Sequence, residues 1–276
     1  MGKKGMLLTA LLIIVGLGIL LYPVISSAVN RRNGSYAIQE WEEQLDGLED
    51  AQLQRHRELA QAYNDCLRSG EEPEGYREIL DLGNGMMGYI RIPSINVDLP
   101  IYHGVGEDVL SKGVGHLPES SLPIGRQGDH AVLTGHTGLP SARLFTDLTK
   151  LQKGDLFFIR VLDDEMCYEV DQILVVLPEE GQDLVPVSGE DYCTLVTCTP
   201  YGINSHRLLV RGRRTDLPAS PILPGLQNIP IPPTRPWWLL ALLPVPAAAV
   251  LLVKRFLDGK RKPAYNGKYL RREKER

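Results

Sequence analysis

One cysteine of this chain stands where a predicted β-strand ends and a turn begins. The β-branched run at 194–197 leads directly to Cys198, and a proline and a glycine follow within four residues. A thiol at the rim of a sheet can meet solvent and substrate, whereas Cys167 and Cys193 lie inside strand patterns and are expected to be small buried hydrophobic residues. Cys198 is therefore the candidate nucleophile.

A cysteine nucleophile needs a proton acceptor near neutral pH, because a free thiol with a pKa of about 8.5 is mostly protonated. Imidazole can supply it. His136 follows a predicted strand and is flanked by Gly135 and Gly138, and glycine permits the backbone to approach closely. His103 competes with it, because it also follows a strand and precedes a glycine. His206 could flank the site, and two histidines are expected to be structural, His116 and His130.

Arg207 begins the strand that follows Cys198. A turn between the two strands would bring both residues to the same end of the sheet. A guanidinium stays charged in proteins, so its role would be to stabilise an oxyanion. An ordinary surface arginine is the alternative interpretation. Taken alone, these residues indicate an exported Cys-His enzyme, and no G-x-S-x-G motif or glycine-rich phosphate loop suggests another class.

The elements that must position these residues are mostly short strands rich in Ile, Val, Leu and Tyr, separated by Gly, Pro and Asp. Many short strands with few helices predict an all-β barrel or sandwich. A helix is expected over 35–67, from its apolar three- and four-residue spacing, and another over 142–151. The strands are expected at 87–92, 97–102, 130–134, 156–161, 166–176, 192–197 and 207–211.

The net charge of −4 hides a strong asymmetry. The tail 254–276 carries a balance of +7 and residues 1–25 add +2, which leaves −13 for the middle of the chain. Two apolar runs separate these regions, 6–25 and 237–253, and the first holds twenty residues without a charge. A run of about 20 apolar residues can span the hydrocarbon core of a bilayer. The basic tail fits a membrane surface better than nucleic acid.

These runs predict two transmembrane helices with both termini in the cytoplasm, because basic residues favour the cytoplasmic side. The chain would then comprise a cytoplasmic N-terminus (1–5), an anchor (6–25), an exported middle and a cytoplasmic tail (254–276). A cleaved signal peptide is the alternative for the first run. Seven prolines between 216 and 236 predict an extended spacer over 215–236.

The cysteine count predicts neither a dense disulfide framework nor a zinc site, because no CxxC and no Cys/His cluster with ligand spacing occurs. The pairing of Cys66, Cys167 and Cys193 stays open. An acidic set could suggest calcium, but its spacing matches no calcium loop. No metal and no cofactor are therefore expected. The acidic set comprises Glu179, Glu180, Asp183, Glu190 and Asp191.

The motifs together resemble those of the sortase family. The sequence TLVTC at 194–198 is similar to the TLxTC signature of sortases, and His136 within LTGHTG and Arg207 complete the family's His-Cys-Arg set. The stretches 83–104, 112–125, 130–155 and 194–212 resemble class C, the pilus-assembling sortases. The resemblance covers nearly all of 83–214.

The resemblance implies a closed eight-stranded sortase-type β-barrel over 83–214, preceded by a helical segment and lid region at 33–82. It implies that Cys198 attacks the Thr–Gly carbonyl of an LPXTG-like sorting signal and passes the acyl group to a pilin lysine. His136 would act as acid and base, and Arg207 would hold the substrate and the oxyanion. Thr197 and Thr137, next to these residues in sequence, are expected to contact the substrate.

One departure from class C concerns the lid, which usually carries an Asp-Pro-aromatic motif. The corresponding stretch here, 69–82, is short and acidic and contains no such motif. An absent, altered or open lid would each fit. A wall-anchoring sortase that uses a peptidoglycan-precursor amine, a thioester hydrolase and a non-catalytic membrane-bound scaffold remain as alternatives.

Overall fold

The computed structural model describes residues 3–218. It divides into an N-terminal unit up to Leu21 and a larger unit that begins at Tyr22. The second apolar run at 237–253, the basic tail and most of the proline-rich spacer lie outside the described residues.

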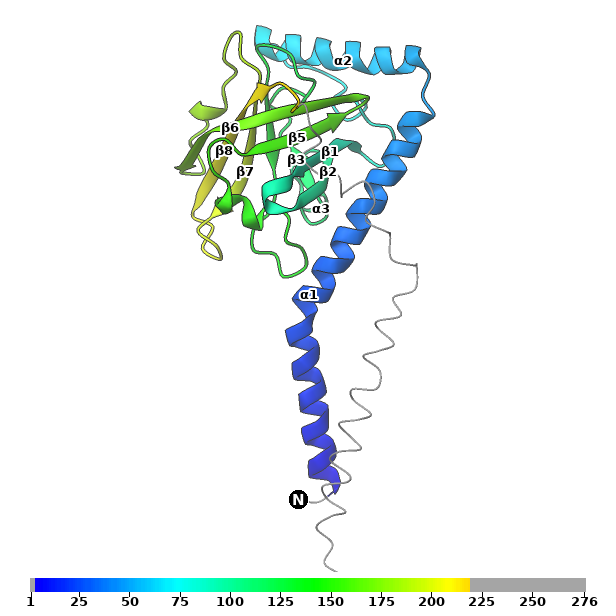
Figure 1. Cartoon of the computed structure of the whole chain (residues 1–276), viewed down its shortest axis with the longest axis vertical. Helices are drawn as coiled ribbons and strands as arrows, with labels where there is room; N and C mark the ends of the chain where they lie inside the picture. The colour runs from blue at the N-terminus through cyan, green and yellow to red at the C-terminus, as the bar shows by residue number, and fades with distance from the viewer. Residues whose placement is uncertain (1–2, 219–276) are drawn as a thin grey trace, which may run out of the picture. The chain divides into compact units, whose positions relative to one another are not determined.

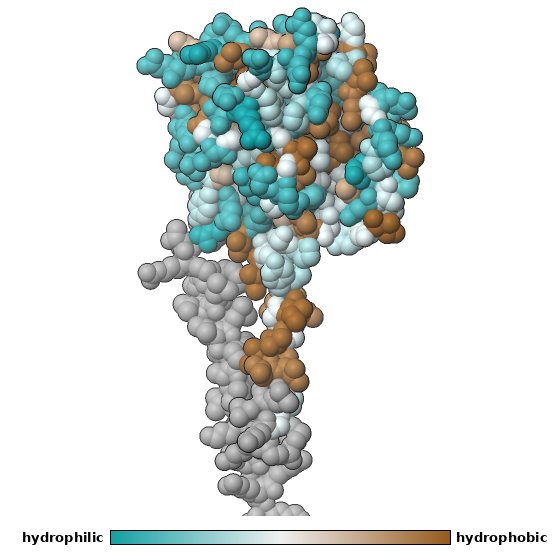
Figure 2. All heavy atoms as spheres, turned by 180° about the vertical axis from the view of Figure 1, so that it is seen from behind, coloured by the Kyte–Doolittle hydropathy of each residue, from teal (hydrophilic) through white to brown (hydrophobic). Residues whose placement is uncertain are grey.

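The N-terminal unit is the start of helix α1 (Lys3–Asp46). Most of the leucine and isoleucine side chains over 11–20 are exposed, among them Ile19 and Leu20 at 71% and 72%. Figure 2 shows apolar side chains gathered along this helix. Within 3–218, it is the one helix long and apolar enough to cross a membrane. The finding agrees with the predicted apolar segment at 6–25.

The larger unit begins with the rest of α1, followed by α2 (Asp50–Ser69). The single helix expected over 35–67 is therefore two helices. Glu49 caps α2 by a capping box with Gln52, and Gly70 ends it in the left-handed region at φ 79°. The apolar spacing continues less regularly beyond the break at Glu49, which is why the spacing alone predicted one helix.

Eight strands form a closed barrel in the order β1-β2-β3-β4-β7-β8-β6-β5 (Figure 1). The closed barrel confirms the fold expected from the sequence. The strand missed by the sequence analysis, β3, has only three residues, too few to show an alternation. The strands are β1 (Met86–Ile92), β2 (Val97–His103), β3 (Val114–His116), β4 (His130–Thr134), β5 (Leu156–Val161), β6 (Asp164–Val176), β7 (Tyr192–Thr199) and β8 (His206–Thr215).

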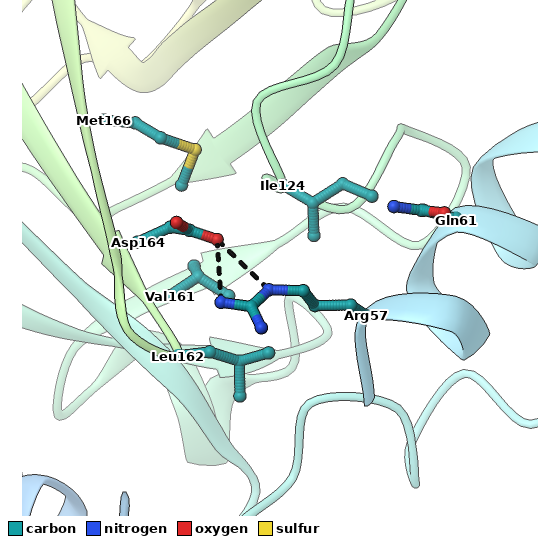
Figure 3. A pocket seen from close by; sticks show the side chains of 7 residues that line it. All are labelled: Arg57, Gln61, Ile124, Val161, Leu162, Asp164 and Met166. Carbon is teal, nitrogen blue, oxygen red and sulfur yellow. Dashed lines mark hydrogen bonds and ion pairs between the residues drawn. The ribbon is translucent and has the colours of Figure 1, made fainter. Parts of the chain in front are cut away.

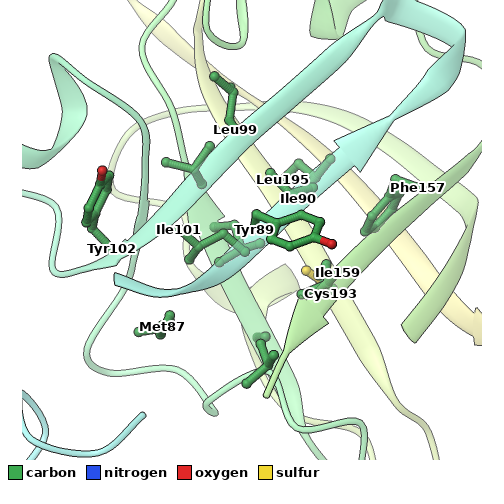
Figure 4. Packing of buried hydrophobic residues seen from close by; sticks show 14 of the residues in the cluster. Met87, Tyr89, Ile90, Leu99, Ile101, Tyr102, Phe157, Ile159, Cys193 and Leu195 are labelled. Atoms are coloured by element: carbon green, nitrogen blue, oxygen red, sulfur yellow. The ribbon is translucent and has the colours of Figure 1, made fainter. Parts of the chain in front are cut away.

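Alternation along the strands fills the barrel. Alternate residues of β7, such as Cys193 and Leu195, are fully buried and join side chains of β1, β2 and β5 in the main core (Figure 4). The intervening residues point to the outer face, where Val196 belongs to a separate small apolar cluster. The wall of the barrel therefore has a packed inner face and a partly apolar outer face.

Helix α2 is attached to the barrel through the buried side chain of Asn64. Its amide donates to the carbonyl of Leu122 (3.0 Å) and to the Asp129 carboxylate (2.8 Å), and its oxygen accepts from the Leu122 N–H (2.8 Å). A small pocket remains where α2 meets the β5–β6 turn, and Arg57 pairs with Asp164 in it (Figure 3). This pocket belongs to the helix–barrel seam.

The described residues also include four short helices: η1 (Pro93–Ile95), α3 (Glu107–Leu110), η2 (Thr146–Lys150) and η3 (Gln182–Leu184). The helix expected over 142–151 is only the 3₁₀ turn η2. Leu144 has φ 36°, outside the right-handed helical region, so an α-helix cannot run through it.

Candidate active site

Cys198 and Arg207 are directly opposed on neighbouring strands. Strands β7 and β8 are antiparallel, and their register pairs Cys198 with Arg207. Side chains of directly opposed residues lie on the same face of the sheet with Cβ atoms about 5 Å apart. The structure thus confirms that both residues lie at the same end of adjacent strands. The turn that joins these strands lies at the end of the barrel away from α2 (Figure 1).

His136 reaches the same end from the other side of β7. Strand β4 is parallel to β7, and its last residue, Thr134, pairs with Val196. The Gly135 N–H then donates to the Val196 carbonyl at 3.0 Å. His136 lies two residues after Thr134, and Cys198 lies two residues after its partner Val196. The parallel register therefore brings the histidine alongside the cysteine, and both side chains are half-buried.

Cys198 and Arg207 lie on the outer face of the barrel. Because strand side chains alternate, Cys198 shares its face with Val196, and Arg207 shares its face with Leu209. Val196 and Leu209 belong to the outer apolar cluster, whereas the intervening Leu195 and Leu208 belong to the core. The thiol is thus on the accessible side of the sheet, next to an apolar strip.

The guanidinium of Arg207 is held by the turn before it. Nη1 donates to the carbonyls of His206 at 3.2 Å and Asn204 at 3.4 Å. Within residues 3–218, no carboxylate forms an ion pair with Arg207. Its positive charge is therefore available to an anion that forms at Cys198.

The imidazole of His136 has a carboxylate partner that the sequence analysis missed. Nε2 lies 3.0 Å from Oε2 of Glu107, the first residue of α3. Glu107 is 29 residues away along the chain, and α3 is too short to produce a periodic pattern. The sequence contains no signal that would have joined these two residues.

His103, His116 and His130 are engaged away from Cys198. Both ring nitrogens of His103 contact backbone carbonyls, those of Gly85 (3.0 Å) and Ile79 (2.7 Å). His116 is fully buried, and burial lowers its pKa to about 4. The two carbonyl contacts of His103 leave it without a ring nitrogen for proton transfer. His136 is therefore the better candidate of the two. His130 is buried as well, as expected for a structural residue.

The other cysteines are poor nucleophiles. All four cysteines are free thiols, and Cys167 and Cys193 are buried. Burial raises the pKa of Cys167 to about 11 and that of Cys193 well above its ordinary value. The pKa of Cys66 is raised by desolvation and by the nearby Glu71 carboxylate. A high pKa keeps a thiol protonated and unreactive.

The neighbouring threonines differ in their surroundings. Thr197 is buried, and its hydroxyl donates to the Gly135 carbonyl at 2.7 Å. This bond joins β7 to the segment that carries His136. Thr137 is half-buried beside the histidine. The substrate contacts expected for Thr197 and Thr137 stay predictions.

The segment 70–82, which corresponds to the expected lid region, packs against the ends of β2 and β3. The Tyr76 hydroxyl contacts Nδ1 of His116 at 3.0 Å and accepts from the Gly104 N–H at 2.9 Å. Ile79 and Leu80 are buried in the main core. Cys198 keeps part of its surface exposed.

The arrangement provides a thiol, an imidazole and a free guanidinium at one rim of the barrel. A thiolate that attacks a carbonyl creates a tetrahedral oxyanion, which a guanidinium can stabilise. An imidazole can protonate the leaving group and later deprotonate the attacking one. The geometry suits acyl transfer through a thioester.

Comparison with known proteins gives a consistent result. Residues 90–215 match the sortase domain family. Among curated proteins, sortase A of Bacillus anthracis is 32% identical over 46% of this chain and 59% of its own length. Sortase A of Streptococcus agalactiae is 28% identical over 70% of this chain and 77% of its own length.

Solved structures of sortase C enzymes are similar in sequence and fold. Sortase C1 of Streptococcus agalactiae is 43% identical, with a TM-score of 0.64 over 66% of this chain and 100% of that chain. Sortase C of Clostridium perfringens, solved with the C-terminal cell wall sorting motif, is 43% identical with a TM-score of 0.62, again over 66% and 100%.

Proposed function

Because this chain belongs to the sortase family of cysteine transpeptidases, we propose that it cleaves an LPXTG-like sorting signal and transfers the product to a lysine amine of a pilin subunit. The single observation that carries the proposal is the register that opposes Cys198 and Arg207 on the accessible face of the barrel, with His136 on the adjacent strand end.

The reaction follows from the positions of these groups. The Cys198 thiol gives its proton to His136 while its sulfur attacks the carbonyl carbon of the Thr–Gly bond, and Arg207 stabilises the oxyanion. The intermediate collapses as the C–N bond breaks, and His136 protonates the leaving glycine amine. The acceptor amine then attacks the thioester and His136 takes its proton. The C–S bond breaks, and His136 returns the proton to the Cys198 sulfur.

The apolar strip beside the thiol is itself buried, with Val132 at 1% and Leu209 at 4% exposure, so it supports the strand ends that carry Cys198 and Arg207. It runs over the outer face of β4, β7, β8 and β6, and its end at Val176 pairs with Arg207. The strip comprises Val132, Val176, Val196 and Leu209, with Leu117, Leu174 and Leu184 packed against them.

The class C neighbours favour a lysine acceptor over a peptidoglycan-precursor amine. Sortase C structures are 43% identical to this chain, whereas the curated sortase A proteins are 32% and 28% identical. The sorting-motif complex of the Clostridium perfringens enzyme supports the substrate class.

The test uses the full chain in detergent micelles, an LPXTG peptide and intact-protein mass spectrometry. We expect an acyl adduct on the parent protein and its transfer when a lysine-bearing pilin domain is added. Cys198→Ala should form no adduct, and Cys66→Ala, which removes another partly exposed thiol, should behave as the parent does.

Product masses also distinguish the alternatives. Release of the free acid in the presence of amine would indicate a hydrolase. Transfer to a peptidoglycan-precursor amine in preference to lysine would indicate a wall-anchoring enzyme. No adduct with any sorting-signal variant, on protein shown to be folded, would contradict the proposal.

A further inference from the structure

Glu107, which contacts His136, lies on a backbone segment that is anchored to the barrel. Helix α3 connects β2 to β3, and Val109 and Leu110 of this helix are buried in the main core. The Gly104 N–H donates to the His116 carbonyl at 3.1 Å just before α3. The backbone of Glu107 is thus fixed from both sides, although its side chain is 77% exposed.

His136 is held from the other direction. Its carbonyl accepts a hydrogen bond from the Phe145 N–H at 3.1 Å, and Phe145 is fully buried. The preceding Gly135 is tied to β7 through Val196 and Thr197. With both backbones fixed, the carboxylate of Glu107 and Nε2 of His136 meet at 3.0 Å.

We propose that Glu107 is a positioning residue that orients the imidazole of His136 for proton transfer in the acyl-transfer reaction. The inference rests on the proposed function and extends it by one residue. A carboxylate that accepts from Nε2–H holds the proton on that nitrogen and fixes the ring. Nδ1 is then the nitrogen that exchanges protons with Cys198 and with the substrate amine.

The carboxylate also supplies a countercharge when it is needed. His136 becomes an imidazolium when it takes the proton of the incoming amine, and a nearby carboxylate stabilises that cation. Asp108, the next residue, is exposed, and its side chain makes no hydrogen bond or ion pair among residues 3–218. It therefore provides a matched control for the removal of one negative charge from α3.

The experiment compares Glu107→Ala with Asp108→Ala in the full chain, measured with the sorting-signal peptide and an amine acceptor. We expect Glu107→Ala to lower kcat about tenfold, a small part of the 10²–10⁴-fold that general acid–base catalysis supplies. KM should change by less than about twofold, because Glu107 acts through His136 rather than on the substrate. Asp108→Ala should keep the parental kcat.

A second measurement does not require turnover. In protein labelled with ¹⁵N-histidine, the imidazole signals of His136, assigned by their loss in His136→Asn, report which nitrogen carries the proton. Parental protein should show the Nε2–H form, and Glu107→Ala should show a mixture. Parental kcat in Glu107→Ala, or unchanged imidazole signals, would overturn the inference. If the parent forms no adduct, the proposed function fails, and the imidazole signals still decide the role of Glu107.

Discussion

The side chain opposite Cys198 decides how the proposed oxyanion is stabilised. Arg207 presents a planar fork of donors, and part of that fork is already bonded to the carbonyls of Asn204 and His206. These bonds keep the guanidinium over the turn while its remaining N–H groups stay available. A lysine would keep the charge but not this geometry, because its ammonium is a point charge on a flexible stem.

We therefore expect Arg207→Lys to slow acyl-enzyme formation by at least about tenfold, and Arg207→Ala by about 10²–10³-fold, the usual cost of losing an oxyanion donor. The rate of adduct formation by mass spectrometry is the measurement. Arg213→Lys on the same strand, where the side chain is exposed and paired with Glu190, should leave the rate unchanged. Equal rates in Arg207→Lys and the parent would contradict the role given to the guanidinium.

Thiol reactivity should separate the four cysteines. Burial raises the pKa of Cys167 and Cys193, and desolvation together with Glu71 raises that of Cys66. Iodoacetamide at pH 8 should therefore modify Cys198 first and leave Cys167 and Cys193 unmodified in folded protein. Peptide mapping of partly alkylated protein gives the order. Early modification of Cys193 would show that the barrel opens more easily than its packing indicates.

At the scale of elements, helix α1 is attached to the barrel by a buried stripe that comprises Ile38, Trp41 and Leu45. Trp41 is 1% exposed and meets the Tyr89 ring edge-on at 5.9 Å. The Tyr89 hydroxyl in turn donates to Glu42 at 3.0 Å. Among residues 3–218, the indole nitrogen of Trp41 has no hydrogen-bond partner. Its contribution should therefore come from packing alone.

Trp41→Ala should lower the free energy of unfolding by about 3–5 kcal/mol, the range for large aromatic residues removed from a core. Trp41→Phe keeps part of the apolar contact and loses no hydrogen bond, so its cost should be smaller than that of Trp41→Ala. Urea unfolding of both variants measures the difference. Similar costs for the two would show that the indole nitrogen matters after all.

At the scale of the whole molecule, two buried groups give the stability an opposing dependence on pH. Burial lowers the pKa of His116 from 6.5 to about 4, so the unfolded state binds more protons and stability falls as the pH drops below 6.5. Burial raises the pKa of Asp191 to about 6, so the folded state binds more protons between about pH 4 and 6. There Asp191 adds stability as the pH drops.

Asp191→Asn removes the pH dependence that comes from Asp191 and leaves the one that comes from His116. Its free energy of unfolding should therefore fall more steeply than that of the parent between pH 7 and pH 5, by about 1 kcal/mol. Urea unfolding at both pH values, with each protein compared with itself, cancels the constant cost of the substitution. An equal or smaller fall in the variant would show that Asp191 is ionised in the folded protein at pH 5.

The exposed apolar start of α1 suggests attachment to a membrane. We expect the full chain to sediment with membranes and to resist extraction by carbonate. The proposed two-pass topology, with the barrel outside and both termini in the cytoplasm, is tested by single cysteines placed at Lys4 and Lys274 in a variant lacking the native ones. An impermeant maleimide should label neither in intact cells. Labelling at position 274 alone would indicate a single span.

Much of the site was accessible from the sequence, because strand ends and turns are local patterns. The run before Cys198, the glycines around His136 and the strand start at Arg207 each give a position near a rim. Period-two alternation likewise separates core from surface along each strand. These patterns depend on neighbouring residues only.

The tertiary structure decided everything that depends on register and closure. It distinguished His136 from His103 by the carbonyls that occupy His103, and it brought Glu107 to the imidazole from 29 residues away. It also showed β3 as a three-residue strand and divided one expected helix at Glu49. Such contacts form between segments remote in sequence, and their energy depends on how the barrel closes, which no local pattern encodes.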